Sequence, residues 1–386
     1  MPHSDAAPIG GSTDAAFGPV RDAFVENFLH RGELGASLCV VADGVVVVDL
    51  WGGWCDRERR SRWQADTLVN VFSVGKAIAA LCVARLVGQG HLGFDDPLSV
   101  LWPEFAARDK SAITVRQLLS HQGGLPAIRQ ELPENSIFDA RRMTAILADE
   151  APWWEPGTAH GYHVNTFGFL VGELVRRASG RSLGTVVANE IAGPLGADFF
   201  IGVPTGDLGR VAEFVGMAES PGPWSSEGKD DGEVMVHHAY FNPPTLSGMG
   251  VINSTAWRTA ELPSTNAHAS GRGIARLYEA MVHAGMSGTT RVTEAAPLAE
   301  AVREEVNGPD LILGRPSRFG LGFQLTQPER PLGPNASSFG HFGAGGSLGF
   351  CDPTAMVSFG YAINTMGPRW QNPRNRALIQ ACYECL

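Results

Sequence analysis

Charged residues are scarce in this chain of 386 residues, where they make up 18% of the total and sum to a formal net charge of −10. Nucleic acids and anionic membranes bind basic protein faces, which 30 Lys and Arg against 40 Asp and Glu do not favour. Long apolar runs are lacking too, because no stretch reaches the roughly 18 residues that a membrane span needs. With 44% hydrophobic residues, the composition predicts a globular protein with neither nucleic acid nor a membrane as partner.

The six cysteines lack the paired spacing that is typical of a metal site. Cys382 and Cys385 form a C-x-x-C near the end of the printed sequence, with no second pair or histidine nearby. We therefore predict reduced thiols in a cytoplasmic protein, with no metal and no cofactor. The opening residues MPHSDAAPIGGSTDAAFG lack a basic segment followed by an apolar one. We expect residues 1–16 to be a flexible tail and not a signal peptide.

Lysine is the rarest cation of the chain, with three lysines against 27 arginines. One of them, Lys76, follows Ser73 by three positions in VFSVGK and stands before the apolar run AIAALCV. In a helix these two side chains share a face, and burial lowers the pKa of a lysine so that it can act as a base. Arginine cannot do so. The motif alone leaves two interpretations open: a nucleophile with its base, or a helix N-cap followed by a surface lysine.

Two G-x-S-x-G strings offer competing serines. The first, around Ser182, follows a helical pattern and not a strand, which is the wrong context for a nucleophile elbow. The second, around Ser347, has no histidine after it, so a Ser, Asp, His order cannot be completed. We interpret both as turns or close-packing glycines.

Strand patterns lie toward both ends of the chain, and helical patterns lie between them. Residues 35–54 predict a hairpin that turns at Asp43-Gly44, and GSLGFCDP and AMVSFGYAINTM predict strands near the C-terminus. We expect an α+β fold whose antiparallel sheet is built from residues 17–75 and 265–386. Residues 76–264 should form a mainly helical region that includes a long irregular segment, 202–250.

Four motifs in order resemble a known family. They are Ser73-x-x-Lys76, then LGFDDPLSVLWPEF followed by ITVRQLLSHQGGLP, then the loop P-G-x-x-x-x-Tyr162, and finally a glycine-rich strand. The chain is similar in these to the S-x-x-K serine hydrolases related to class C β-lactamases and penicillin-binding proteins. PGTAHGYHVNTFGFLVGELVRR and GHFGAGGSLGFCDP look most like the family VIII carboxylesterases. This resemblance implies a β-lactamase-like fold and hydrolysis of ordinary esters through an acyl-enzyme.

The resemblance also assigns the proton-handling groups. It implies that Ser73 is the nucleophile, that Lys76 is its base and that Tyr162 is the second proton-handling residue. The backbone N–H groups of Ser73 and Ala344 would form the oxyanion hole. In the β-lactamase relatives an asparagine two places after the tyrosine contacts the substrate, whereas Asn165 stands three places after Tyr162. Asn165 is therefore a substrate-binding candidate that departs from the pattern.

The Lys-Thr-Gly strand of the β-lactamases corresponds here to His341-Phe342-Gly343. A histidine there is mostly neutral near pH 7, so the departure favours neutral ester substrates over β-lactams. The alternative interpretation of His341 is a hydrogen-bonded residue at a strand edge. Gly343 and Gly345 would let this strand approach the acyl group closely.

The segment 202–250 carries aromatic residues that are candidates for the substrate pocket. Trp224 and Tyr240 are predicted to line it, although the segment can equally be a surface cover. The predicted partner is a small-molecule ester, and a homodimer is left open. Within the same superfamily, an amide or peptide hydrolase, a weak β-lactamase or an acyltransferase are alternative functions. Outside enzymology, a non-catalytic penicillin-binding module is the alternative.

Overall fold

The computed structural model describes residues 7–386. Its largest element is a nine-stranded sheet in which every neighbouring pair is antiparallel. In spatial order the strands are β1 (Ile9–Thr13), β3 (Val45–Gly53), β2 (Gly35–Ala42), β14 (Val357–Ile363), β13 (Leu348–Asp352), β12 (Phe339–Phe342), β11 (Gln324–Leu325), β10 (Pro316–Phe319) and β9 (Val306–Pro309). The predicted hairpin at Asp43-Gly44 is confirmed as β2 and β3. Because β2 pairs with β14, the two ends of the chain meet inside the sheet, as the α+β prediction requires.

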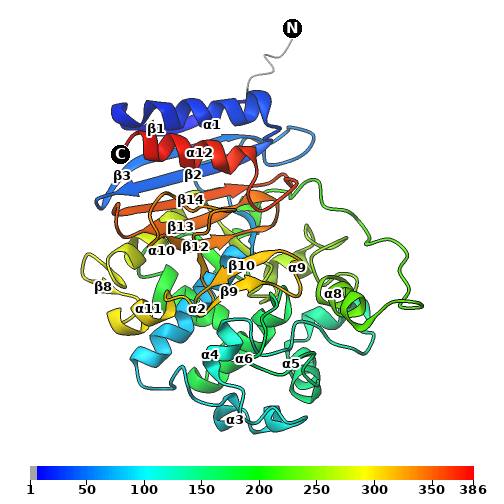
Figure 1. The fold of residues 1–386 in the computed structure, drawn as a ribbon. Helices are drawn as coiled ribbons and strands as arrows, with labels where there is room; N and C mark the ends of the chain where they lie inside the picture. The colour runs from blue at the N-terminus through cyan, green and yellow to red at the C-terminus, as the bar shows by residue number, and fades with distance from the viewer. Residues whose placement is uncertain (1–6) are drawn as a thin grey trace.

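Helices cover both faces of this sheet. α1 (Gly18–His30) and α12 (Pro373–Glu384) lie side by side over one face, and the C-terminus of the chain is nearby (Figure 1). Leu38 and Val40 of β2 pack in the cluster beneath these two helices. Cys39 and Val41, which alternate with them, pack against Ala275 of α10 (Gly271–Val282) on the other face. The sheet is therefore a central layer between helices.

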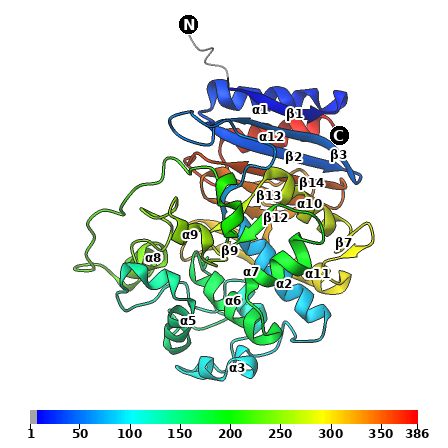
Figure 2. The ribbon, with the colours of Figure 1, turned by 180° about the vertical axis from the view of Figure 1, so that it is seen from behind.

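A second region carries most of the remaining helices. It contains α2 (Val74–Gly88), α3 (Leu98–Leu101), α4 (Val115–Leu119), α5 (Ala140–Asp149), α6 (Thr166–Ser179) and α7 (Leu183–Val186), and α3 to α6 lie far from α1 and α12 in both views (Figure 1, Figure 2). The helix α2 is buried from Val74 to Ala84, as its apolar residues on every side predict. It begins directly after β4 (Val69–Phe72). That strand pairs with β6 (Ala267–Ala269), which in turn pairs with β5 (Phe199–Ile201), in a small sheet of their own.

The predicted flexible tail, residues 1–16, needs correction. Residues 1–6 lie outside the described residues, but Ile9–Thr13 form the edge strand β1, which pairs with β3 from Ile9↔Gly52 to Thr13↔Val48. Gly11 has φ +101, and a side chain there would meet the Asp49 carbonyl. The sequence of β1, IGGST, is small and polar and so does not predict a strand. Pairing with β3, and not side-chain burial, holds β1 in place.

The expectation for residues 202–250 is also only partly right. The segment contains an irregular stretch, but Asp231–Phe241 form the helix α8. A capping box begins it, in which the Asp230 side chain accepts from Glu233 N and the Glu233 side chain accepts from Asp230 N. The short strands β9 and β10 were likewise not predicted. The other elements are α9 (Thr255–Thr259), α11 (Ala295–Ala301) and the β7–β8 hairpin (Met286–Ser287 and Thr290–Arg291).

Candidate active site

Ser73 lies at the junction between β4 and α2. The residue before it, Phe72, has φ +49, a left-handed conformation that is costly for an aromatic residue and marks a sharp turn from strand into helix. Ser73 occupies the N-cap position of α2, yet its side chain makes no capping hydrogen bond. Its Oγ lies instead 3.1 Å from Lys76 Nζ and 3.3 Å from the Ser264 carbonyl oxygen. The helix-capping interpretation of this serine is therefore wrong.

Lys76 is fully buried, and its Nζ has three neighbours that can share a hydrogen bond. The Val164 carbonyl oxygen is 2.6 Å away, the Ser264 carbonyl oxygen 3.0 Å, and Ser73 Oγ 3.1 Å. Burial holds the pKa of the Lys76 ammonium well below its usual range. A neutral amine can donate its two N–H groups to the two carbonyls, which leaves the lone pair for the Ser73 hydroxyl proton. The site thus has the geometry of a serine with a neutral base.

Tyr162 lies on the loop before α6, with its ring against Lys76. The Lys76 ammonium nitrogen is 4.8 Å from the ring centroid, and the phenol is almost completely buried. Burial raises the pKa of Tyr162 well above its usual value, against the opposing effect of a hydrogen bond with Ser73. Tyr162 is therefore a neutral phenol near pH 7. Burial thus lowers the pKa of Lys76 and raises that of Tyr162.

His341 on β12 faces the phenol of Tyr162. Its Nδ1 lies 2.7 Å from the Phe342 carbonyl oxygen and must donate to it, so Nε2 is the acceptor nitrogen. That Nε2 lies 3.5 Å from the Tyr162 hydroxyl. Burial lowers the pKa of His341 to about 3. The position that resembles the lysine of the β-lactamase strand is thus held by a neutral imidazole.

The loop after β12 comes close to the start of α2. A side chain at Gly343 would meet the Val71 carbonyl oxygen at 2.3 Å, so this position requires glycine. Within residues 7–386, the backbone N–H groups of Ser73 and Ala344 donate to no backbone or side-chain acceptor. The carbonyl of Gly345, which has φ +79, is held from behind by Asn372 Nδ2 at 3.0 Å. The loop is rigidly supported while two amides stay unpaired.

The other predicted substrate-binding residues lie around α8. Asn165 donates from its Nδ2 to the Ala239 carbonyl at 2.8 Å and to Ser247 Oγ at 3.1 Å, so its amide nitrogen already holds α8. Trp224 stacks on His237 with ring centroids 3.6 Å apart and is 37% exposed. It lies at the surface of α8. Tyr240 packs against the apolar cluster that contains Tyr162, which brings it near one of the catalytic candidates.

His121 is a residue to which the sequence assigned no role, although it stands in the quoted motif ITVRQLLSHQGGLP. Its carbonyl accepts from Gly161 N at 3.1 Å and its Nδ1 accepts from His163 N at 3.2 Å, so it holds the backbone on both sides of Tyr162. Its ring also packs against the Tyr162 ring, with centroids 4.9 Å apart. The only sequence signal for His121 is that a histidine stands within that motif.

Ser264 and Ser182 show how differently the serines of the chain are used. The carbonyl of Ser264 binds Lys76, and its Oγ accepts from Gly168 N at 2.6 Å, which ties the residue to α6. No sequence pattern marks it, because its contribution comes largely from the backbone. Ser182, in the first G-x-S-x-G string, caps α7 by accepting from Thr185 N. This agrees with its interpretation as a structural residue.

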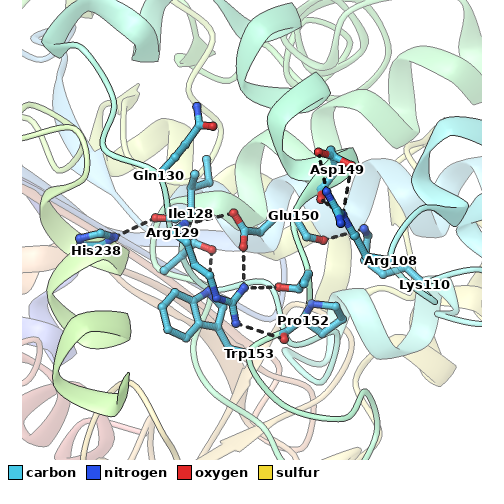
Figure 3. Close-up of polar contacts among 12 residues, drawn as sticks. Arg108, Lys110, Ile128, Arg129, Gln130, Asp149, Glu150, Pro152, Trp153 and His238 are labelled. Carbon is cyan, nitrogen blue, oxygen red and sulfur yellow. Dashed lines mark hydrogen bonds and ion pairs between the residues drawn. The ribbon is translucent and has the colours of Figure 1, made fainter. Parts of the chain in front are cut away.

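A surface hollow of about 520 Å³ beside α5 is separate from these residues. It is lined by Arg108, Arg129, Gln130, Ala145, Ile146, Asp149, Glu150 and Ala151. Figure 3 shows its charges in pairs, Arg129 with Glu150 and Arg108 with Asp149. Among residues 7–386 there is no group of three His, Cys, Asp or Glu side chains that could hold a metal ion. No helix in that range has the length and apolar character to cross a membrane.

Comparison with known proteins identifies the family of the chain. The family model described as Beta-lactamase matches residues 21–382. The chain is 30% identical to the Esterase/beta-lactamase LipL of Mycobacterium tuberculosis over 375 residues, which cover 93% of this chain and 83% of LipL.

Two solved structures are similar along nearly the whole chain. The crystal structure of a family VIII carboxylesterase has a TM-score of 0.91 and 39% identity, and covers 98% of this chain and 100% of that one. A penicillin-binding protein homologue from Caulobacter crescentus has a TM-score of 0.89 and 39% identity over the same shares. The protein therefore has the β-lactamase-like fold of a serine hydrolase, and the chain belongs to the beta-lactamase family.

Proposed function

We propose that this protein is a carboxylesterase that hydrolyses short-chain esters through an acyl-enzyme on Ser73. The observation that carries the proposal is the position of Lys76 Nζ, 3.1 Å from Ser73 Oγ and bonded to two carbonyls. Burial lowers the pKa of that amine, so it can take a proton from Ser73 near pH 7. The esterase-named relatives support the ester as the bond that is cleaved.

In the acylation step, Lys76 takes the Ser73 proton while Oγ forms a bond to the ester carbonyl carbon. The carbonyl oxygen becomes an oxyanion, and the unpaired N–H groups of Ser73 and Ala344 donate to it. When the carbon–alkoxy bond breaks, the Tyr162 phenol gives its proton to the leaving alcohol. The Lys76 ammonium then returns a proton to Tyr162, so the alcohol leaves neutral and Ser73 stays acylated.

In the deacylation step, water replaces the alcohol. The neutral Lys76 amine takes a proton from water, with the Tyr162 phenol as a relay that gives up one proton as it receives another, and the water oxygen bonds to the acyl carbon. The Ser73 Oγ–acyl bond breaks, Oγ regains a proton from Lys76, and the carboxylic acid is released. Within each half of the cycle Lys76 and Tyr162 give back the proton that they take up, so no cofactor is required.

The test compares Ser73→Ala with Ser182→Ala on p-nitrophenyl acetate. We expect Ser73→Ala to lose activity by at least about 10³-fold, as the loss of a serine nucleophile does. Ser182→Ala removes a serine in a competing motif that caps α7 and donates to Glu261, and it should keep the wild-type rate. Wild-type activity in Ser73→Ala would refute the proposal.

Mass and substrate panels separate the alternatives. Intact-mass measurement should detect a transient acyl adduct on the wild-type protein and none on Ser73→Ala. In a non-catalytic binding module, the adduct on the wild-type protein would persist because it is not hydrolysed. A panel of short and long acyl esters, nitrocefin and a D-amino-acid amide tests the amidase and β-lactamase alternatives. Turnover of nitrocefin or of the amide above that of every ester would contradict the esterase assignment.

Two further expectations remain predictions. A cytoplasmic location accords with six cysteines that are all unpaired in the described chain. A homodimer is the second, and sedimentation of the purified protein measures it directly.

A further inference from the structure

Positive charge gathers on one side of the candidate site. Arg315 lies in the turn between β9 and β10, and its guanidinium carbon is 4.9 Å from the ring centroid of Trp370. The Trp370 ring in turn meets the Tyr162 ring edge to face, with centroids 5.3 Å apart. Asp310 in the same turn accepts from Tyr162 N at 3.0 Å. Arg315 is thus anchored one aromatic ring away from a candidate catalytic residue.

Two more arginines add to this charge. Burial, and then the charge of Arg315, lowers the pKa of Arg330 to about 10. Burial likewise lowers the pKa of Arg315, and the positive charge of Arg369 lowers it further. Within residues 7–386 none of the three forms an ion pair. Arg330 donates to the Pro316 carbonyl at 2.7 Å, and it lines a narrow cavity together with Trp370.

Among the described residues, the acidic groups nearby form no ion pair with the cluster. Asp310 is fully engaged: its Oδ1 accepts from the backbone N–H groups of Tyr162, Ile312 and Leu313, and its Oδ2 from Ser317 Oγ. Glu329 is exposed beside Arg330. In the hollow beside α5, by contrast, each arginine has its carboxylate partner. A half-buried arginine that has no ion-pair partner among the described residues can bind an anion with its guanidinium.

We infer that Arg315, which lies over the Trp370 ring, binds a carboxylate carried by the ester substrate. The inference rests on the proposed function and narrows it to esters with an anionic group away from the scissile bond. His341 is neutral and cannot attract such a group, so the charge that recognises it lies on the β9–β10 turn and not on β12. The planar guanidinium can grip a carboxylate with two N–H groups, and Arg330 and Arg369 strengthen the local field.

The test uses two matched pairs of esters. Mono-p-nitrophenyl glutarate and p-nitrophenyl pentanoate differ by a carboxylate on the acyl side, and p-acetoxybenzoate and its methyl ester differ by one on the alcohol side. We expect Arg315→Gln to lower kcat/KM by about 10- to 100-fold for at least one anionic ester, the size of a lost charge-assisted hydrogen bond. Both neutral esters should stay within about twofold, which also shows that the variant is folded. For Arg315→Lys, kcat/KM on that anionic ester should lie between the values of the wild type and of Arg315→Gln, because lysine keeps the charge but cannot donate two parallel N–H groups.

A matched control is Arg142→Gln, which removes one positive charge from the exposed face of α5. This variant should leave kcat/KM unchanged for all four esters. The inference is overturned if Arg315→Gln affects each anionic ester and its neutral partner equally, or if Arg142→Gln has the same effect as Arg315→Gln. Ser73→Ala, measured on the neutral esters, separates the two ideas. If Ser73→Ala abolishes turnover while Arg315→Gln changes kcat/KM equally for anionic and neutral esters, the esterase proposal is supported and the proposed anion subsite is wrong.

Discussion

At the scale of single residues, two buried lysines of this chain show what makes one of them a base. Lys110 is as buried as Lys76, but its Nζ donates to three backbone carbonyls, those of Ala107, Ala148 and Glu150. All three N–H groups of an ammonium are thereby used, so Lys110 holds loop and helix together. Lys76 has only two carbonyls and a hydroxyl around it. Burial alone therefore does not distinguish these two lysines, whereas the third carbonyl around Lys110 does.

The pH dependence of activity follows from this arrangement. Lys76 must be neutral to accept the Ser73 proton, and its pKa is lowered, so kcat/KM on a neutral ester should be flat at high pH and fall as pH drops through that pKa. The measurement is kcat/KM for p-nitrophenyl acetate across the acid and neutral range. Tyr162→Phe should be slower by about 10²-fold or more but keep the same acid limb. If the limb disappears in Tyr162→Phe, the titrating group is not Lys76.

The sequence predicted the side chains of the site better than their supports. Ser73, Lys76 and Tyr162 stand in spaced motifs whose chemistry depends on the side chain, so they can be recognised from letters alone. Ser264 and His121 act largely through a carbonyl or a ring nitrogen that binds backbone N–H groups. Any residue has a carbonyl, and only the fold decides which one faces the lysine.

At the scale of elements, the site depends on how closely β12 approaches β4. Gly343→Ala would put a methyl group 2.3 Å from the Val71 carbonyl and push the loop that carries the Ala344 amide away from Ser73. We expect a loss in kcat of about 10²-fold or more, as the removal of one oxyanion donor causes. The KM should change much less.

The matched control for that substitution is Gly206→Ala. A side chain at Gly206 would meet nothing within 4 Å, and its backbone is not in the left-handed region. Its activity and its thermal midpoint should equal those of the wild type. Equal activity of Gly343→Ala and Gly206→Ala would mean that β12 does not set the position of the oxyanion donors.

The elements that the sequence predicted are those with strong local signals. The β2–β3 hairpin has Asp43-Gly44 at its turn, and α2 and α10 have long apolar patterns. The strand β1 and the pair β9–β10 were missed because they are short and half-exposed, and pairing with a neighbour stabilises them. The capping box of α8, Asp230 with Glu233, was a readable signal that glycine and charge in the same segment obscured.

At the scale of the whole molecule, several buried histidines make stability depend on pH. Burial lowers the pKa of His163 to about 4 and those of His268 and His341 to about 3, against 6.5 in an unfolded chain. Between these values the unfolded chain binds protons that the folded chain refuses, so lowering the pH favours unfolding. Each such histidine removes up to about 1.4 kcal/mol per pH unit below its unfolded pKa.

Urea unfolding followed at a series of pH values measures this effect. The midpoint should fall steadily as pH decreases from about 6.5 toward about 5, above the range in which ordinary carboxylates titrate. His30→Gln, on the exposed surface of α1, should leave the slope unchanged. A midpoint that stays constant over that interval would contradict the buried, neutral state of these histidines.

The order of strands in the large sheet has a consequence for biosynthesis. The strand β2 leaves the ribosome early but finds its inner partner, β14, only when the last part of the chain has been made. The loop with Gly343 and Ala344 is likewise separated from Ser73 by most of the sequence. Such distant pairings form slowly and leave the edge of β2 exposed meanwhile. The nascent chain should therefore be both catalytically silent and dependent on chaperones until synthesis is almost complete.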